Sequence, residues 1–211
     1  MIIPAVLTNN FNEFKLQAQK LGACSNLVQI DVMDGIFVSN KSFVERAEIN
    51  NLSLNLNFEL HLMVARPLEE LDSWKSVKNI TRIIFHLESK DNPDAVITAI
   101  RGCCGSVGIA INPETNLERL EPYAKQINEV LFMTVHPGEQ GARFLPEVGE
   151  KIKQFKRNYS DILIGVDGGV NLDTISLAKS WGADVFCVGS ALSQAADPML
   201  MFKNLKLKIE N

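Results

Sequence analysis

The chain has 211 residues, of which 46% are hydrophobic and 22% are charged, and its formal net charge at pH 7 is -4. This length and composition suffice for one large α/β domain, and the acidic balance without a basic cluster argues against a nucleic-acid-binding surface. The four cysteines form no Cys-x-x-Cys pair and eighteen apolar residues never run together, so neither a zinc knuckle nor a membrane span is indicated. We therefore expect a soluble cytoplasmic protein that contacts neither nucleic acid nor membrane.

Short apolar runs alternate with segments of helical spacing along the whole chain. The runs predict strands at residues 2–7, 27–32, 58–63, 80–86, 106–111, 130–135, 162–166 and 185–188. Helix-capping residues follow several of them, such as Asn10, Asn92 before Pro93, and Asn171, which we expect to open the seventh helix. Eight strand–helix units in about 200 residues is the count of a (β/α)8 TIM barrel. We predict a single α/β barrel domain over residues 1–211.

Two of the expected helices depend on few residues. Residues 42–49 carry a weak helical pattern, and Leu117, Leu120 and Tyr123 recur at helical spacing after the fifth strand. We expect a helix in both places.

Residues 28–35 read Val-Gln-Ile-Asp-Val-Met-Asp-Gly, an apolar run interrupted by residues that can bind, orient or ionise. Ligands bind at the carboxyl ends of the strands in parallel α/β proteins, so Asp31, Met33 and Asp34 would face a ligand. The alternative is that Asp31 caps the next helix or pairs with a buried lysine, and the other strands must decide between them.

Polar residues on three predicted strands would converge on one end of such a barrel. Gln29 and Asp31 share a face of the second strand, His61 lies on the third and Asp167 ends the seventh. A lone histidine in an apolar strand is more often a satisfied core residue, but its coincidence with two aspartates favours a ligand. The set suits a divalent metal, borderline between zinc and the harder manganese, iron or magnesium.

Glycine clusters follow three consecutive late strands. Gly138 and Gly141, Gly168 with Gly169, and Gly189 before Ser190 would expose backbone N–H groups where late barrel loops commonly bind phosphate. A glycine after a strand is usually only a turn, yet three such turns together favour a phosphate site.

Three methionines, Met33, Met63 and Met133, stand near strand ends beside the polar candidates. Core packing is the ordinary role of each. Grouped over the barrel mouth, they would form a polarisable lid against a flat, electron-rich intermediate.

Together these motifs resemble those of ribulose-phosphate 3-epimerases over essentially the full chain. The matching segments are residues 30–35 (Ile-Asp-Val-Met-Asp-Gly), 59–63 (Glu-Leu-His-Leu-Met), 133–138 (Met-Thr-Val-His-Pro-Gly), 166–169 (Val-Asp-Gly-Gly) and 189–191 (Gly-Ser-Ala). The resemblance implies a TIM barrel of the ribulose-phosphate-binding type. It also implies interconversion of ribulose 5-phosphate and xylulose 5-phosphate around a divalent metal, with Asp31 and Asp167 as acid and base on opposite faces of the sugar.

The sequence departs from this family at several of the same places. The family usually has a histidine metal ligand in place of Gln29, a serine near the substrate in place of Ala5, and an asparagine in place of His136. In the glycine-rich loop, Glu139 would be unfavourable beside a phosphate unless it points away, whereas Arg143 could help to bind one. Gln29 can offer a carbonyl oxygen but binds transition metals more weakly than imidazole does.

Our leading hypothesis is an isomerase that acts on a small phosphorylated ketose, and we expect a homo-oligomer. Its substrate-binding residues would be His61, Met33, Met63, Met133, Gly138, Gly141, Gly168, Gly169, Gly189 and Ser190, and its metal ligands Asp31, His61, Asp167 and Gln29. The departures leave two alternatives open, an epimerase of a hexulose 6-phosphate or a weakly active or non-catalytic sugar-phosphate-binding paralogue. A lyase such as hexulose-phosphate synthase or orotidine-phosphate decarboxylase is less consistent, because the Asp-x-Lys-x-x-Asp motif of those families does not occur in this sequence.

Overall fold

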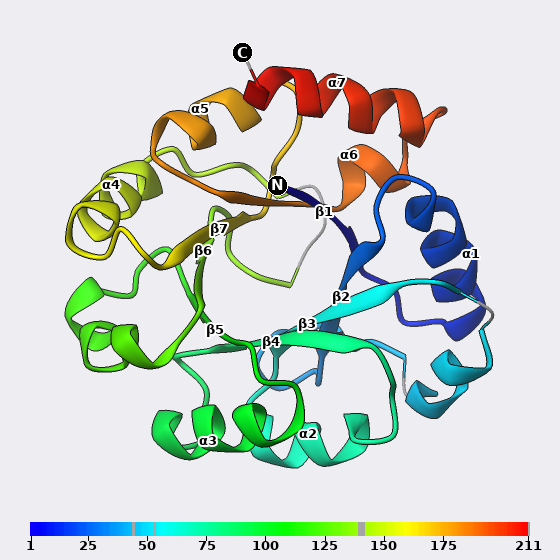
Figure 1. Ribbon diagram of the computed structural model, residues 1–211, viewed down its shortest axis with the longest axis horizontal. Helices are drawn as coiled ribbons and strands as arrows, with labels where there is room; N and C mark the ends of the chain where they lie inside the picture. The colour runs from blue at the N-terminus through cyan, green and yellow to red at the C-terminus, as the bar shows by residue number, and fades with distance from the viewer. Residues whose placement is uncertain (44, 53, 139–141, 211) are drawn as a thin grey trace.

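A computed structural model of the protein describes residues 1–43, 45–52, 54–138 and 142–210. Its eight strands are all parallel and close into a barrel in sequence order, with β8 returning to pair with β1. Figure 1 looks into this barrel and shows the helices as an outer ring around it. The fold is a TIM barrel, as the alternation of strand and helix patterns predicted.

All eight predicted strands are present. They are β1 (Ile2–Val6), β2 (Leu27–Met33), β3 (Asn57–Met63), β4 (Ile80–His86), β5 (Val107–Ile111), β6 (Glu129–Met133), β7 (Leu163–Asp167) and β8 (Val185–Val188). Nearly every residue in them is buried, because the barrel interior covers one face of each strand and the helices cover the other. This two-sided burial explains why the sequence shows continuous apolar runs rather than alternation.

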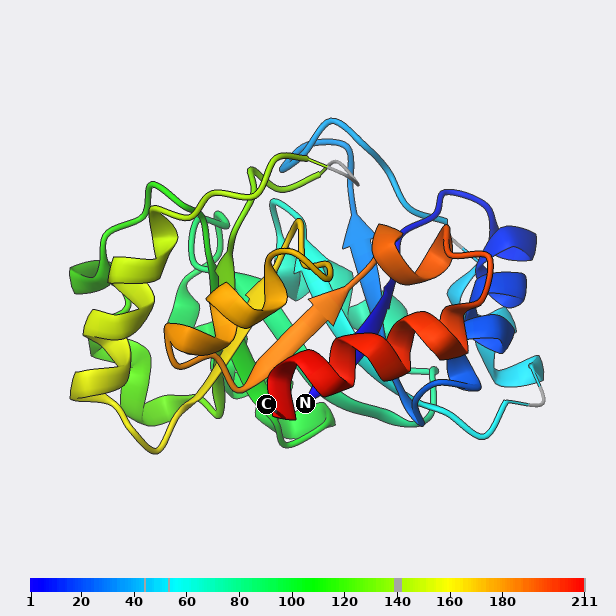
Figure 2. The ribbon, with the colours of Figure 1, turned by 90° about the horizontal axis from the view of Figure 1, so that it is seen from above.

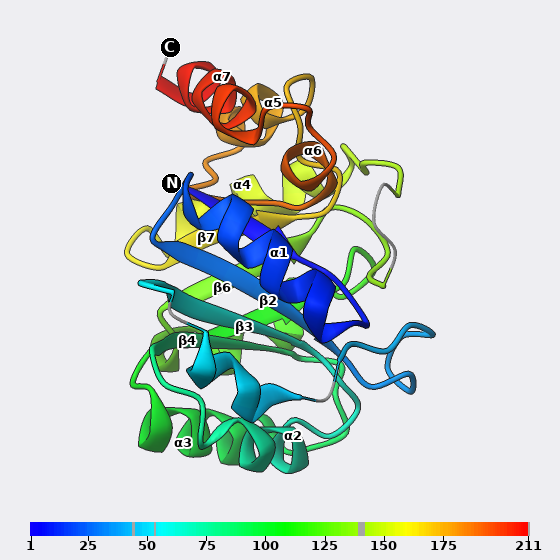
Figure 3. The same cartoon turned by 90° about the vertical axis from the view of Figure 1, so that its right-hand side faces the viewer.

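Several helices begin at a capping side chain or at a proline. They are α1 (Phe11–Gly22), α2 (Pro67–Trp74), α3 (Pro93–Cys103), α4 (Val148–Asn158), α5 (Ile175–Ser180), α6 (Ser190–Ser193) and α7 (Pro198–Glu210). The Asn10 side chain accepts hydrogen bonds from the amides of Asn12 and Glu13, and Pro93 stands in the first turn of α3. Figure 3 shows α1 lying along the outer side of β1 and β2.

Three expectations about helices were wrong. Residues 46–51 form a short 3-10 helix, η1 (Arg46–Asn51), in which Ile49 alone is buried, so the segment lacks the apolar face of an α-helix. The fifth unit contains η2 (Leu117–Arg119) and η3 (Glu121–Gln126) in place of the expected helix, and Pro122, which has no N–H to donate, excludes one continuous α-helix through both. Asn171 caps a turn through the amides of Asp173 and Thr174, and α5 begins only at Ile175.

A layer of charged side chains fills the barrel interior below the carboxyl ends of the strands. Arg82 on β4 forms ion pairs with Glu59 on β3 and Glu129 on β6, and neither glutamate has any solvent exposure. Burial raises the pKa of Glu129 to about 8, and the charge of Glu59 adds to this effect while Arg82 opposes it. The two glutamates and one arginine therefore form a compact buried group, which we call the arginine layer.

The carboxyl ends of the strands all lie at one side of the molecule. Figure 2 places the loop that follows β2, in light blue, and the loop that follows β6, in green, together at this side, whereas both chain termini lie at the other. The side chains at the strand ends therefore lie together, where they can form a site.

None of the described helices has the length and apolar character needed to cross a membrane.

Candidate active site and metal centre

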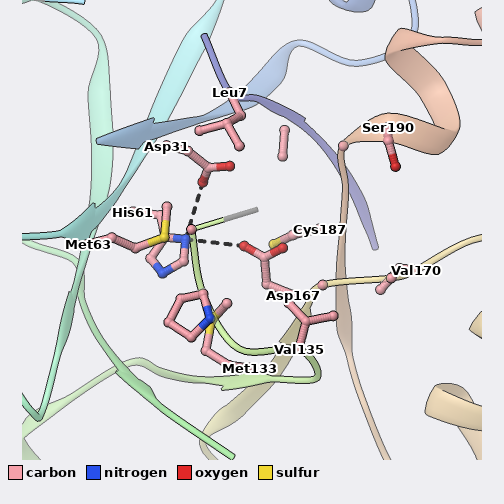
Figure 4. Close-up of a pocket in the computed structure, with 16 residues that line it drawn as sticks. Leu7, Asp31, His61, Met63, Met133, Val135, Asp167, Val170, Cys187 and Ser190 are labelled. Carbon is pink, nitrogen blue, oxygen red and sulfur yellow. Dashed lines mark hydrogen bonds and ion pairs between the residues drawn. The ribbon is translucent and has the colours of Figure 1, made fainter. Parts of the chain in front are cut away.

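Asp31, His61 and Asp167 meet inside the barrel at the carboxyl ends of their strands. Asp31 on β2 and His61 on β3 are register partners, and Asp167 is the last residue of β7. The Nδ1 atom of His61 lies 3.2 Å from Oδ1 of Asp31 and 3.2 Å from Oδ2 of Asp167, the two contacts dashed in Figure 4. The fold thus brings together three residues that the sequence places on separate strands.

The electrostatics of this group centre on one imidazole between two carboxylates. Burial opposes a charge on His61, but hydrogen bonds and charge from Asp167 and Asp31 outweigh it and raise the pKa of His61 to about 10. Burial raises the pKa of Asp31, and the hydrogen bond with His61 opposes this shift. Without a metal, His61 is therefore an imidazolium that offsets part of the negative charge of the pair.

Gln29 reaches the same two carboxylates from β2. Its Nε2 donates to Oδ1 of Asp31 at 2.9 Å and to Oδ2 of Asp167 at 2.8 Å. Its Oε1 atom is buried, and among the described residues it has no hydrogen-bond partner. Such an orphaned acceptor costs about 1–3 kcal/mol. The amide nitrogen, not the oxygen expected for a metal ligand, thus faces the carboxylates.

These residues fit a divalent cation. Asp31, His61 and Asp167 each offer one ligand atom, and the three atoms lie within 4.8 Å of one another. Two carboxylate oxygens and one imidazole nitrogen suit zinc as well as iron, manganese or magnesium. Gln29 could add its Oε1 atom as a ligand only if the side-chain amide flipped. The flip would also give Oε1 the partner that it now lacks.

A second histidine stands behind the first, and our sequence reasoning missed it. His86 ends β4, and its Nε2 lies 2.9 Å from Nε2 of His61. Its Nδ1 lies 3.4 Å from Oε2 of Glu88, and the ring of Phe37 covers it at a centroid distance of 4.7 Å. His86 also ends an apolar strand, so this position could have marked it in the sequence, as the same feature marked His61.

Glu88 is itself fixed by neighbouring donors. Its Oε1 accepts a hydrogen bond from the amide of Asn112 at 2.9 Å and another from the Thr115 hydroxyl. Burial opposes its ionisation, but the hydrogen bonds from His86 and Thr115 prevail and lower the pKa of Glu88 to about 2. Glu88 is therefore an anion at neutral pH.

The glycines of the late strands line the same cavity. Gly138, Gly168, Gly169, Gly189 and Ser190 all border it, and Figure 4 shows Ser190 across the cavity from His61. Gly168 has a φ of 107°, and a Cβ there would come within 2.3 Å of the Val135 side chain, so the close approach of these loops requires glycine. Gly141 and Glu139 lie outside the described residues.

The three methionines separate into two groups. Met63 and Met133 line the cavity, as does Cys187, which is the register partner of Asp167. Met33 is not among the lining residues and instead packs with Met63 and Val38 in a small apolar cluster. Two of the three methionines therefore face the place where a substrate would bind.

Other sequence candidates take different positions. We expected Asp34 to face a ligand, but it does not border the cavity. Its carboxylate accepts hydrogen bonds from the amides of Ile36, Phe37 and Ala65 and so anchors the loop after β2. Ala5 lines the cavity, and Arg143 borders an adjoining pocket together with Gly169 and Ser190.

Comparisons with known proteins show which family the chain matches. A model of the ribulose-phosphate 3 epimerase family matches residues 1–193. The ribulose-phosphate 3-epimerase of Buchnera aphidicola subsp. Schizaphis graminum (strain Sg) is 30% identical over 214 residues, which cover 98% of this chain and 93% of that protein. The cytoplasmic isoform of ribulose-phosphate 3-epimerase from Oryza sativa subsp. japonica is 31% identical over 218 residues, with 99% and 94% covered.

A solved structure shares the architecture at much lower sequence identity. The 3-hexulose-6-phosphate synthase of Salmonella typhimurium is similar with a TM-score of 0.75 and 15% identity, covering 99% of this chain and 98% of that one. At this identity the likeness shows the barrel alone, since one fold supports many reactions. The family match over residues 1–193 is the specific finding: the chain belongs to the ribulose-phosphate 3-epimerase family.

Proposed function

We propose that the protein epimerises D-ribulose 5-phosphate to D-xylulose 5-phosphate, a reaction of the pentose phosphate pathway. One observation carries the proposal: Asp31 and Asp167, on β2 and β7, both lie 3.2 Å from the same imidazole nitrogen of His61. Two carboxylates that approach one point from different strands are what an inversion through proton transfer on opposite faces requires. Membership of the epimerase family supports the same reaction.

The chemistry needs an acid and a base in turn. The C–H bond next to the ketone breaks, its electron pair forms an enediolate, and a proton then returns to the opposite face of that carbon. We assign these two proton transfers to Asp31 and Asp167. One must be protonated when the other is not, so the two carboxyl groups exchange roles during the reaction. Burial, which raises the pKa of Asp31, favours the protonated form of that residue.

Asp31, His61 and Asp167 would hold the cation, and Gln29 is a fourth candidate ligand. When bound, a divalent cation would supply Lewis-acid stabilisation for the negative charge that develops on the ketone oxygen. The Gln29 amide holds both carboxylates in place through its two hydrogen bonds. The identity of the cation, among zinc, iron, manganese and magnesium, is part of the proposal.

The substrate would lie between the methionines and the late glycine loops. We place its phosphate at Gly168, Gly169, Gly189 and Ser190, with Arg143 near enough in the adjoining pocket to add positive charge. Met63 and Met133 would cover the planar enediolate with polarisable sulfur. We further propose a cytoplasmic homo-oligomer whose partner is a small phosphorylated sugar and which binds neither nucleic acid nor membrane. The rice cytoplasmic isoform supports the location.

Turnover with and without metal tests the proposal. We expect the purified protein to convert ribulose 5-phosphate to xylulose 5-phosphate, to lose this activity after treatment with a chelator, and to regain it when a divalent cation is restored. Ribulose without its phosphate should have a lower kcat/KM. Absence of turnover with every cation would contradict the epimerase and favour a sugar-phosphate-binding paralogue. Activity that survives complete metal removal would exclude the metal from the reaction.

A hexulose 6-phosphate is the second candidate substrate. Ala5 lines the cavity with a methyl group where the related epimerases usually carry a serine hydroxyl, so this site has one polar group fewer and more room. A higher kcat/KM for a hexulose 6-phosphate than for ribulose 5-phosphate, measured side by side, would assign the longer sugar.

Replacing Gln29 by histidine should strengthen the metal site. An imidazole at this position can ligate a cation without an amide rotation, and it removes the orphaned Oε1 atom. Because outer partners alone change metal affinity about 10–100-fold, we expect Gln29→His to tighten zinc binding by at least about tenfold and to raise turnover at limiting metal. Zinc titration against a chromophoric chelator measures this. Equal affinity in the two proteins would show that Gln29 does not face the ion.

A further inference from the structure

His61, His86 and Glu88 form a continuous hydrogen-bonded chain that leads away from the two aspartates, which we call the histidine–glutamate chain. The two imidazoles face each other through their Nε2 atoms at 2.9 Å, with ring centroids 5.1 Å apart. Both rings are fully buried. At this distance one nitrogen must carry a proton and the other must accept it, so the protonation pattern of one ring dictates that of the other.

The far end of the chain fixes that pattern. Glu88 is ionised and can only accept hydrogen bonds, so the proton between it and His86 belongs to Nδ1 of His86. His86 is fully buried beneath the ring of Phe37, and burial favours the uncharged imidazole, which carries a single N–H. Its Nε2 atom is therefore an acceptor, and it must accept from Nε2–H of His61.

His61, at the other end of the histidine–glutamate chain, then has a defined role. A cation would displace the Nδ1 proton that His61 carries without a metal, while the proton on Nε2 stays, so Nδ1 is the atom that can offer a lone pair. Nδ1 is also the atom that faces Asp31 and Asp167. We propose that Glu88 and His86 are positioning residues that set the tautomer and the ring orientation of His61, so that Nδ1 is presented to the cation. This inference rests on the proposed metal-dependent function and adds two residues to it.

The orientation of Glu88 allows a substitution that should reverse the chain. In Glu88→Gln, the amide oxygen is expected to stay toward the donors that Oε1 now meets, the Asn112 amide and the Thr115 hydroxyl. Its NH2 group would then point at Nδ1 of His86 and donate to it. His86 would have to carry its proton on Nε2, and the His61 nitrogen opposite would have to accept it. A neutral His61 would then keep its proton on Nδ1, where the cation should bind.

The tautomers can be observed directly, because the chain has only three histidines. Long-range proton–nitrogen correlation spectra of the zinc-loaded protein should show His61 protonated on Nε2 with Nδ1 bound to zinc, and His86 protonated on Nδ1. His136, which is exposed and pairs with Glu114 at the surface, provides the internal reference. A zinc bond through Nε2 of His61, or a proton on Nε2 of His86, would overturn the proposal without any variant.

Zinc affinity measured by chelator competition supplies the second readout. We expect Glu88→Gln to weaken zinc binding about 10–100-fold, and Glu88→Asp, which keeps a carboxylate, to retain more of the affinity. Glu114→Gln is the matched control, since it removes a carboxylate from the exposed histidine and should leave zinc binding unchanged. Wild-type affinity in a folded Glu88→Gln protein would overturn the proposal, and equal losses in the Gln and Asp variants would also contradict it.

The outcome is separable from that of the proposed function. A protein with the expected tautomers and zinc affinities but without epimerase turnover would support the positioning role and contradict the epimerase. A protein that epimerises ribulose 5-phosphate but shows the reverse tautomers would contradict the positioning role and support the epimerase.

Discussion

Replacing either Asp31 or Asp167 by asparagine is expected to lower epimerase turnover by about 10²–10⁴-fold, the usual contribution of a general acid or base. Asparagine keeps the shape of the side chain but can neither accept nor return a proton at the sugar carbon. The fold should persist, because both positions lie at strand ends and His61 and Gln29 retain hydrogen-bond partners. Turnover by each variant with saturating metal, together with circular dichroism, measures the two effects.

Solvent exchange makes this test sharper. If one aspartate serves each face of the sugar, then a variant that keeps the other should still exchange the carbon-bound proton of one epimer with deuterium from solvent, without inversion. Asp72→Asn, on the exposed surface of α2, is the matched control and should behave as wild type. Near-normal epimerisation in either site variant would refute the two-carboxylate assignment.

Removing the arginine from the arginine layer should have the largest effect on the free energy of unfolding. Arg82→Met would leave Glu59 and Glu129 buried without a cation, and breaking a buried ion pair in this way costs about 3–5 kcal/mol. That is a large part of the roughly 5–15 kcal/mol that stabilises an ordinary domain. The free energy of unfolding in urea measures it, with Arg66→Met, which disrupts an exposed pair, as the control. A loss no greater than that of the control would mean that the layer is not needed for folding.

The same layer predicts a pH dependence. The pKa of Glu129 is raised in the folded protein from its ordinary value of 4.5 to about 8, so the folded state holds this proton more tightly than the unfolded chain does. Its contribution to stability is fully present below about pH 4.5 and is lost as the pH rises toward 8. Glu129→Gln, which keeps the Arg82–Glu59 pair, should therefore flatten the dependence of unfolding free energy on pH between these values.

The sequence was most informative where burial leaves a continuous pattern. Strands that are covered on both faces appear as apolar runs, and for this reason all eight could be placed. Asp31, His61 and Asp167 were identifiable because each polar group stands near the end of such a run. Their closeness depended only on the barrel, whose geometry brings the strand ends together.

The features that could not be predicted depend on which way a side chain points in the folded barrel. Both a ligand oxygen and a donor nitrogen are present in Gln29, and the sequence does not say which one faces the carboxylates. Glu59, Arg82 and Glu129 stand within three different strands, and only the barrel interior makes them partners. Pro122 was the signal in the sequence against one continuous α-helix in the fifth unit, and the helical spacing of the apolar residues did not show that break.

The closure of β8 onto β1 bears on how the protein is synthesised. The donor Gln29 and the acceptor Asp167 are 138 residues apart, and the strand that completes the barrel comes later still. A nascent chain that has emerged only through β6 carries Asp31 and His61. It still lacks Asp167 and the strands β7 and β8, which close the barrel and exclude water from the site. The site is therefore assembled as a whole late in translation, and no contiguous half of the chain contains a working version of it.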